Sequence, residues 1–339
     1  MDARIETLAG QLEAALSNEL GGRVRVGNLV RLSGGASRET WAFDAKGAGG
    51  GAMSLILRKD FEGGRALGLA ALMGEPDDYD RAAEYALFQA LHAAGLPVPR
   101  PVCLPDPATG LSDCFVMERI EGEGLPRKLL RDEAFAEARS TMTAAIGAVA
   151  ARIHGVEPGK LPQLPLRDVA SQLVLCRRML DLGGAPRPVF ELALRWCADH
   201  APGAAETPRL VHGDFRNGNF LVGPEGLRAV LDWEYAHLGD PMEDLGFLCL
   251  KPWRFGNHAL HAGGFGTREE LFKSYEAAGG GAVDPEAVRF WEVLGTVKWG
   301  ALCTIRAALH LNGVQRSVEA AAIGRRVAET EFDLIHLLG

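Results

Sequence analysis

Several features that would identify a functional class at once are missing from this sequence. Its six cysteines are scattered and none forms a C-x-x-C pair, so neither a zinc site nor a dithiol redox motif is indicated. No apolar run approaches the roughly 20 residues that a membrane span needs. Basic residues form no stripe, and the net charge of −8 argues against a general nucleic-acid binder. We therefore expect a reduced, cytoplasmic protein whose partners are neither nucleic acid nor membrane; its oligomeric state stays open.

The first sixteen residues carry acids and lack the apolar core of a signal peptide. The spacing of their apolar side chains predicts an amphipathic helix with one buried face. These side chains are Ile5, Leu8, Leu12 and Leu16. With 339 residues, the whole chain is long enough for two lobes, each with its own core.

The first third of the chain is rich in strand signals. Residues 24–32 alternate between apolar and polar side chains, and the Gly-rich segment 46–53 is typical of a hairpin turn. Residues 76–95 predict a helix that is capped by Asp77 or Asp78 and ended by Gly95. Together these signals predict an antiparallel sheet with one long helix.

The character of the chain changes near residue 120, after which Ala- and Leu-rich segments with helical periodicity dominate. Strand-like runs interrupt them only around 209–232. We expect a β-rich lobe over 1–117, a hinge at 118–124 and a larger α-rich lobe over 125–339.

The segment 209–222, RLVHGDFRNGNFLV, places many polar side chains in a short loop between two strand-like runs. Each polar group that such a loop buries needs a partner, so the loop is either a solvated turn or a place where those groups converge on a ligand. If the neighbouring strands pair, Asp214, Asn219 and Asp232 meet at one edge. Carboxylate and amide oxygens are hard ligands that suit Mg²⁺, and a carboxylate can also accept a proton from a hydroxyl.

Those groups are the ones that phosphoryl transfer requires, because the protein mainly positions reactants and neutralises charge. No P-loop of the form G-x-x-x-x-G-K-[ST] is present. The alternative kinase pattern H-x-D-x-x-x-x-N is matched by His212, Asp214 and Asn219. This order and spacing favour a catalytic loop over three unrelated turn residues.

With AVLDWEYAHLGDPMEDLG at 229–246, the loop resembles the aminoglycoside phosphotransferase and choline kinase superfamily. Within it, the chain is similar to the phosphotransferase-like domain found fused to some acyl-CoA dehydrogenases. The resemblance implies an α+β, protein-kinase-like two-lobed fold, with an N-terminal antiparallel sheet lobe that binds nucleotide and a larger helical C-terminal lobe. It also implies that ATP and Mg²⁺ are the cofactors and that a small hydroxylated molecule is the substrate.

The resemblance assigns roles to the residues of the catalytic segment. Asp214 corresponds to the base that orients the acceptor hydroxyl, and Arg216 lies where a cation near the γ-phosphate is expected. Asn219 and Asp232 correspond to the magnesium ligands, and Glu234 either supports the metal site or contacts the substrate. Asp240 and Asp244 are expected to hold the catalytic loop through its backbone N–H groups.

The resemblance also implies a nucleotide site in the first third of the chain. Arg58 takes the place of the strand lysine that holds the α- and β-phosphates, and Glu84 is its expected ion-pair partner. Lys59 should face the other side of the strand. The backbones of Glu118 and Ile120 correspond to the adenine connector. Phosphate contacts are expected from the turn residues Ser33, Gly34, Gly35 and Ser37.

Two other functions remain as alternatives, a nucleotide-binding regulator without turnover and a metal-dependent hydrolase. Aminoglycosides and choline call for anionic or aromatic pockets. The C-terminal region instead has basic residues among aromatics, which is compatible with an anionic or partly apolar alcohol such as a hydroxyacyl-CoA. These basic residues are Arg254, Arg268, Lys298 and Arg306.

Overall fold

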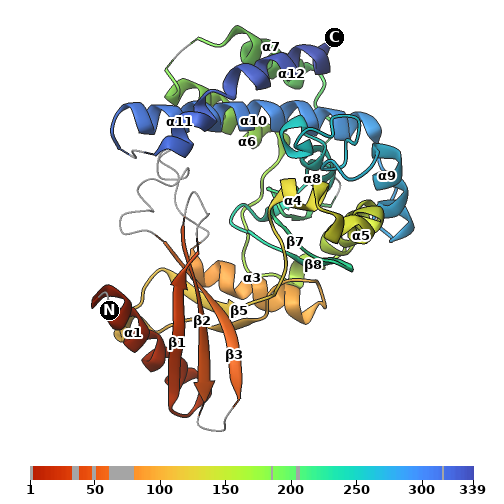
Figure 1. Ribbon diagram of the computed structural model, residues 1–339. Coiled ribbons are helices and arrows are strands. Elements are labelled where there is room, and N and C mark those ends of the chain that lie inside the picture. The colour runs from red at the N-terminus through yellow and green to blue at the C-terminus, as the bar shows by residue number, and fades with distance from the viewer. Residues whose placement is uncertain are drawn as a thin grey trace. The chain divides into compact units, whose positions relative to one another are not determined.

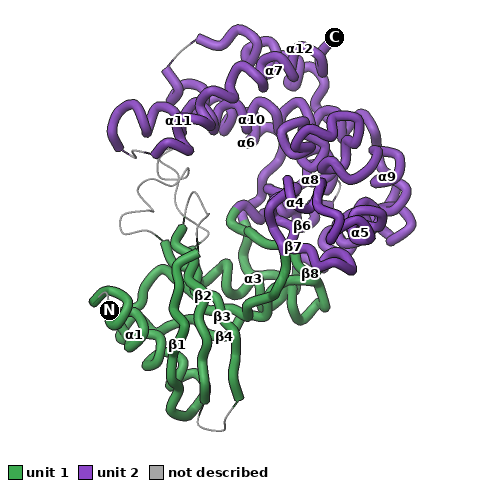
Figure 2. The backbone as a smooth tube through the Cα atoms, viewed as in Figure 1, with its two compact units in different colours: residues 1–122, 159–164, 228–234 green, residues 123–158, 165–227, 235–339 purple. Residues whose placement is uncertain are grey.

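The computed structural model of the chain consists of two compact units (Figure 2). It describes residues 3–32, 38–47, 51–60, 80–184, 186–203, 207–314 and 317–339. Unit 1 comprises residues 1–122, 159–164 and 228–234, and unit 2 comprises residues 123–158, 165–227 and 235–339. The functional division into lobes at 118–124 stays a prediction.

Unit 1 is built on a five-stranded antiparallel sheet with the strand order β1-β2-β3-β5-β4 (Figure 1). Its strands are β1 (Val24–Arg31), β2 (Arg38–Gly47), β3 (Ala52–Asp60), β4 (Pro101–Cys103) and β5 (Cys114–Glu118). Its helices are α1 (Ala3–Leu20), α3 (Arg81–Ala93) and the short 3₁₀ helix η2 (Pro107–Thr109). The predicted antiparallel sheet and N-terminal helix are confirmed.

Helix α1 packs on one face of the sheet through the apolar stripe that its sequence predicts. Leu8, Leu12 and Leu16 are buried there against Phe43 of β2 and Leu57 of β3. Because side chains alternate along a strand, Lys59 shares this face with Leu57, and it lines a pocket together with α1 residues. Arg58 therefore extends from the opposite face of β3.

Helix α3 begins later than the sequence pattern predicts. Its N-cap is Asp80, whose side chain accepts the backbone N–H of Ala83 at 2.8 Å. Asp77 and Asp78, the predicted caps, lie outside the described residues. The predicted end is confirmed, since the helix stops at Ala93 and Gly95 has a φ of 72°.

Unit 2 is mainly helical. Its helices are α4 (Pro126–Arg131), α5 (Ala136–His154), α6 (Val169–Leu182), α7 (Pro188–Asp199), α8 (Met242–Leu248), α9 (Arg268–Ala277), α10 (Pro285–Leu311), α11 (Val318–Gly324) and α12 (Val327–Leu338), with 3₁₀ turns η3 (Glu133–Phe135) and η5 (Lys251–Arg254). A further 3₁₀ turn, η4 (Pro158–Lys160), lies at the boundary between the units. The long helix α10 packs against α6, α7, α8, α11 and α12, so it forms the centre of this helical core. The predicted α+β class is confirmed.

The two strands on either side of the loop 212–219 do not pair with each other. β6 (Arg209–Val211) pairs antiparallel with β9 (His237–Gly239), whereas β7 (Phe220–Gly223) and β8 (Gly226–Val230) form a separate two-stranded sheet. The sequence pattern missed β9, because a three-residue strand carries too little periodicity. Among the helices of the described residues, none is both long and apolar enough to cross a bilayer.

Candidate active site

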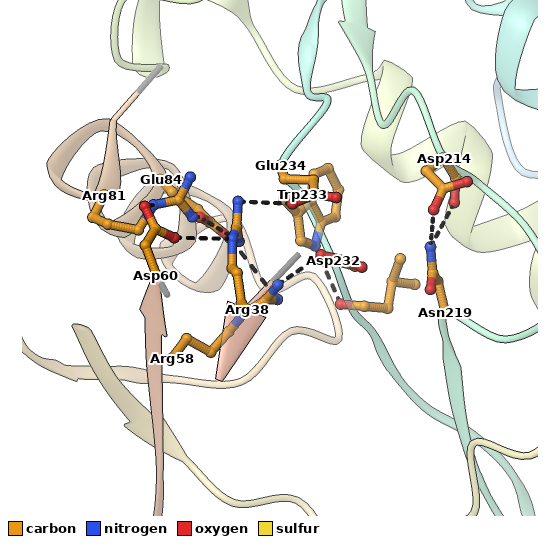
Figure 3. Close-up of polar contacts among 11 residues, drawn as sticks. Arg38, Arg58, Asp60, Arg81, Glu84, Asp214, Asn219, Asp232, Trp233 and Glu234 are labelled. Atoms are coloured by element: carbon orange, nitrogen blue, oxygen red, sulfur yellow. Dashed lines mark hydrogen bonds and ion pairs between the residues drawn. The ribbon is translucent and has the colours of Figure 1, made fainter. Parts of the chain in front are cut away.

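The loop between β6 and β7 brings two predicted site residues together. Asn219 donates from Nδ2 to Oδ2 of Asp214 at 2.7 Å and to its backbone carbonyl at 2.9 Å (Figure 3). The chain turns through Gly213 with a φ of 80°, and a Cβ there would lie 2.5 Å from the carbonyl oxygen of Tyr235. Only glycine meets both conditions, so this turn depends on residue 213.

The orientation of these side chains determines their chemistry. Because the amide nitrogen of Asn219 faces Asp214, its oxygen Oδ1 is the atom left to coordinate a cation. Each carboxylate oxygen of Asp214 receives a hydrogen bond, one from Asn219 and one from Arg216 Nε at 2.8 Å. A carboxylate oxygen can accept more than one hydrogen bond, so Asp214 can still accept one from a hydroxyl.

Arg216 is held on two sides. Besides its bond to Asp214, its guanidinium lies over the ring of Trp253, with 4.6 Å from Cζ to the ring centroid. Trp253 lies in η5 and was not singled out by the sequence pattern. A contact between Arg216 and the γ-phosphate stays a prediction.

Asp244 of α8 fixes the start of the loop, as predicted. Its carboxylate accepts the backbone N–H groups of His212 at 2.8 Å and Gly213 at 3.0 Å. Asp240 does not share this role. It accepts the N–H of Met242 at 2.9 Å and the indole N–H of Trp291 at 2.8 Å. The reason is its place just before Pro241, where its side chain caps the first turn of α8.

A buried histidine extends the Asp244 contacts. Nε2 of His154 lies 3.0 Å from Oδ2 of Asp244, and its Nδ1 lies 2.9 Å from the hydroxyl of Tyr275. Burial raises the pKa of Tyr275, and the Asp244 charge adds to this, so the phenol keeps its proton.

In unit 1, Asp232 lies two residues past the end of β8, in an unusual backbone conformation. Its φ is 68°, the left-handed region that non-glycine residues seldom adopt. Nη2 of Arg58 donates to its Oδ1 at 2.7 Å (Figure 3). Burial by itself lowers the pKa of Arg58, but Asp232, Glu234 and Asp60 together outweigh this, and the pKa rises above its usual value. Since Asp214 and Asn219 belong to unit 2, the meeting of all three residues stays a prediction.

The predicted ion pair between Arg58 and Glu84 is present but long, at 3.9 Å. Arg38 is closer to this carboxylate, with Nη1 3.0 Å from Oε2, and Arg81 also bonds it. Glu84 is fully buried. The sequence pattern did not single out Arg38. Its position shortly after Gly34 and Gly35 was the signal that the sequence offered. In the structure it pairs with Asp60 in the β2–β3 register.

The remaining residues predicted for the nucleotide site have fewer contacts that bear on their roles. Glu234 forms an ion pair with Arg38, 2.9 Å from Nη2, and a role at the metal or the substrate stays a prediction. The backbone N–H of Glu118 donates to the carbonyl of Arg100 at 2.9 Å, so the carbonyl of Glu118 is the group left for an adenine. Ile120 follows the end of β5, and its role also stays a prediction. The predicted turn residues Ser33, Gly34, Gly35 and Ser37 lie outside the described residues.

Three of the four basic residues invoked for an anionic acceptor have acidic partners. Arg254 lies 3.0 Å from Glu292, and Arg268 bonds the same carboxylate. Lys298 lies 3.6 Å from Glu243. These three cations neutralise acids of the helical core, so they give no support to an anionic acceptor.

The donor set suits a metal that binds few protein groups. In the described ranges, no three His, Cys, Asp or Glu side chains are grouped to hold a metal ion. Mg²⁺ typically takes one or two carboxylates and completes its shell with water and substrate phosphates. Asp232 and the amide oxygen of Asn219 fit that pattern, because both are hard oxygen donors.

Comparison with known proteins agrees with this chemistry. Residues 28–291 match the model of a family described as "Phosphotransferase enzyme family". Acyl-CoA dehydrogenase family member 11 of Pongo abelii is 25% identical over 288 residues, which cover 78% of this chain and 34% of that protein. The human protein of the same name is 26% identical over 255 residues, 70% of this chain and 30% of that protein. The chain therefore spans about a third of the length of these relatives.

Solved structures share the fold. A protein from Ralstonia eutropha JMP134, assigned as an aminoglycoside phosphotransferase, aligns with a TM-score of 0.70 and 22% identity, covering 96% of this chain and 97% of that one. A spectinomycin phosphotransferase bound to ADP and spectinomycin aligns with a TM-score of 0.64 and 15% identity, covering 96% of this chain and 97% of that one. Choline kinase from Streptococcus pneumoniae aligns with a TM-score of 0.60 and 17% identity, covering 98% of this chain and 100% of that one.

Proposed function

Because the chain belongs to the phosphotransferase enzyme family, we propose that it transfers the γ-phosphoryl group of ATP to a hydroxyl of a small molecule. The observation that carries this proposal is the contact of Asn219 with Asp214 in a loop that Asp244 holds. The amide nitrogen of Asn219 makes this contact and its oxygen Oδ1 is left for a cation, which supports the proposed roles of Asp214 as base and Asn219 as metal ligand.

In this proposal the residues of the chain orient groups and carry charge. Asp214 accepts a hydrogen bond from the acceptor hydroxyl, orients its oxygen toward the phosphorus and receives its proton. Arg216 holds Asp214 in place. Arg58 binds nucleotide phosphates, and the carbonyl of Glu118 accepts from the adenine. Asp232 and Asn219 would hold Mg²⁺, which would supply positive charge to neutralise the nucleotide phosphates.

The acceptor is an alcohol whose identity we leave to experiment. Two similar structures are named for spectinomycin and for choline, and the curated relatives are named acyl-CoA dehydrogenases. Hydroxyacyl-CoA thioesters therefore belong in the test panel together with aminoglycosides and amino alcohols.

A nucleotide-binding regulator without turnover is the second candidate. The observation that favours it is the contact of Arg58 with Asp232. While this contact lasts, Arg58 is not free to bind phosphate and Asp232 is not free to bind a metal ion. The hydrolase alternative loses support, because the family match is to phosphotransferases.

Coupled ADP release tests the proposal. Wild-type protein with Mg-ATP is screened against the alcohol panel, and nucleotide binding is measured separately by ADP-dependent thermal stabilisation. ADP release that depends on one class of alcohol supports the kinase. Thermal stabilisation by ADP without turnover on any alcohol supports the regulator instead.

A further inference from the structure

Arg38 is the centre of a buried charge cluster in unit 1. Its guanidinium contacts three carboxylates from three parts of the chain (Figure 3). Nη1 lies 3.0 Å from Glu84 of α3, Nη2 lies 2.9 Å from Glu234, and Nε lies 3.4 Å from Asp60 at the end of β3. The planar fork of an arginine carries its donors on three separate nitrogens, so each carboxylate here meets a different nitrogen.

Arg58 has a different set of contacts. Among the carboxylates of the described residues, Asp232 is the close one at 2.7 Å, and Glu84 is 3.9 Å away. Nε of Arg58 is buried and has no hydrogen-bond partner, although the residue is only 9% exposed. A buried guanidinium with an unused donor can form a further bond when a ligand enters.

The two ion pairs also differ in burial. The side chains of Arg38 and Glu84 are 5% and 0% exposed, whereas Asp232 is 30% exposed. Separating the fully buried pair leaves an uncompensated charge in the interior, which is costly. Opening the contact at the partly exposed Asp232 costs much less, because water can solvate that carboxylate.

Among the described residues, three arginines, Arg38, Arg58 and Arg81, face the four carboxylates of Asp60, Glu84, Asp232 and Glu234. A divalent cation at Asp232 would take the place of the Arg58 charge there, because both would bind the same carboxylate. The guanidinium so released would meet the negative phosphates that arrive with the cation.

We propose that Arg38 is the positioning residue that ties α3 and the 232–234 segment to the sheet, while Arg58 exchanges Asp232 for nucleotide phosphate when a divalent cation binds Asp232. This inference rests on the proposed nucleotide site. It assigns to Arg38 the contact with Glu84 that the kinase pattern predicts for Arg58. It also means that Arg58 and Asp232 bind each other only until the metal and the nucleotide arrive.

The test compares single variants of the two arginines in the full chain. The variants are Arg38→Lys, Arg38→Gln, Arg58→Lys and Arg58→Gln, with Arg25→Gln as the control for lost charge. The side chain of Arg25 on β1 is 63% exposed and lies 3.4 Å from Glu13, so its loss should change none of the three readouts. Mn²⁺ affinity without nucleotide is measured by electron paramagnetic resonance, ADP affinity by calorimetry and stability by urea unfolding.

For Arg58→Gln we expect Mn²⁺ to bind at least about 10-fold more tightly, because Arg58 no longer competes for Asp232. ADP should bind about 10-fold more weakly, since a charged phosphate contact is lost, and Arg58→Lys should restore most of that affinity. Equal Mn²⁺ affinity in wild type and Arg58→Gln would overturn the exchange.

For both Arg38 variants we expect the urea midpoint to fall, and Arg38→Lys should not rescue it, because one ammonium cannot bond three separated carboxylates. If Arg38→Gln does not fold, Glu234→Gln and Arg38→Lys carry the test. Both should lower the midpoint more than Arg58→Lys does; the opposite ranking would refute the role of Arg38. These readouts need no turnover, so failure of the kinase proposal would show separately, as absent ADP release with unchanged Mn²⁺ and ADP binding.

Discussion

Oδ2 of Asp244 accepts the backbone N–H of His212 at 2.8 Å, across 32 residues of sequence. The same carboxylate accepts the N–H of Gly213 and contacts His154, so one buried side chain serves three partners. The loop that follows β6 is thereby held at its start by α8 as well as by the pairing of β6 with β9.

We expect Asp244→Asn to reduce turnover and to destabilise the protein by about 3 kcal/mol, because an amide has one acceptor oxygen and its NH₂ would face a backbone donor. Urea unfolding and ADP release measure the two effects. Asp240→Asn is the matched control and should retain more of both, since Asp240 does not contact the loop. Equal losses in the two variants would contradict a special role for Asp244.

Asp214→Asn should lower turnover by about 10³-fold or more, because the base is lost while the loop keeps its shape. Its ADP affinity should stay near that of wild type. Asp232→Asn should weaken Mg-ADP binding as well as turnover, since it removes a metal ligand. Steady-state rates and calorimetry distinguish the two patterns, with Asp199→Asn at the exposed end of α7 as the control. Unchanged rates in Asp214→Asn would reject it as the base.

Glu243 provides a test by pH. Burial alone would raise its pKa, but His237, Lys298 and a hydrogen bond from Gln172 lower it to about 2. The unfolded chain therefore binds the proton first, and the contribution of Glu243 to stability is complete above about pH 4.5 and declines as the pH falls toward 2. Urea unfolding should give a difference between wild type and Glu243→Gln on the order of 3 kcal/mol at pH 6, shrinking below pH 4.5. A difference that is constant between pH 6 and pH 3 would be inconsistent with this pKa.

The cysteines should be unreactive in the folded protein. All six are buried, and burial raises the pKa of Cys103 to about 11 and that of the other five to about 12. Since the thiolate is the reactive form, an aromatic disulfide reagent at pH 8 should modify them slowly in buffer and quickly in denaturant. Rapid modification of any cysteine in buffer would show that its segment opens in the native state.

Gly246 tests the packing of α8 against α10. A Cβ at this position would lie 2.6 Å from Cβ of Trp291 and 2.8 Å from the carbonyl oxygen of Val288. Gly246→Ala should therefore destabilise the protein by about 1–3 kcal/mol, measured by urea unfolding. Gly10→Ala in α1 has open space and should stabilise by up to about 1 kcal/mol through helix propensity. The prediction is wrong if both variants change stability in the same direction.

The local pattern of the sequence determined the helices, the strands and part of the catalytic loop. The alternation of β2 and β3 decides which side chains meet α1, and the spacing in α1 decides which of its side chains are buried. Asp214 and Asn219 are five residues apart, so a single tight turn suffices to bring them into contact. Such features depend on periodicity and turn geometry, which neighbouring residues encode directly.

Only the tertiary structure decided which charged groups are partners. Glu84 was expected to serve Arg58, yet Arg38 lies closer to it across 46 residues, and His154 meets Tyr275 across 121. Asp240 and Asp244 look equivalent in the sequence, but only Asp244 reaches the loop. The physical reason is burial, because a buried charge is stable only with a partner within a few ångströms. Which side chains come that close depends on how distant segments of the chain pack.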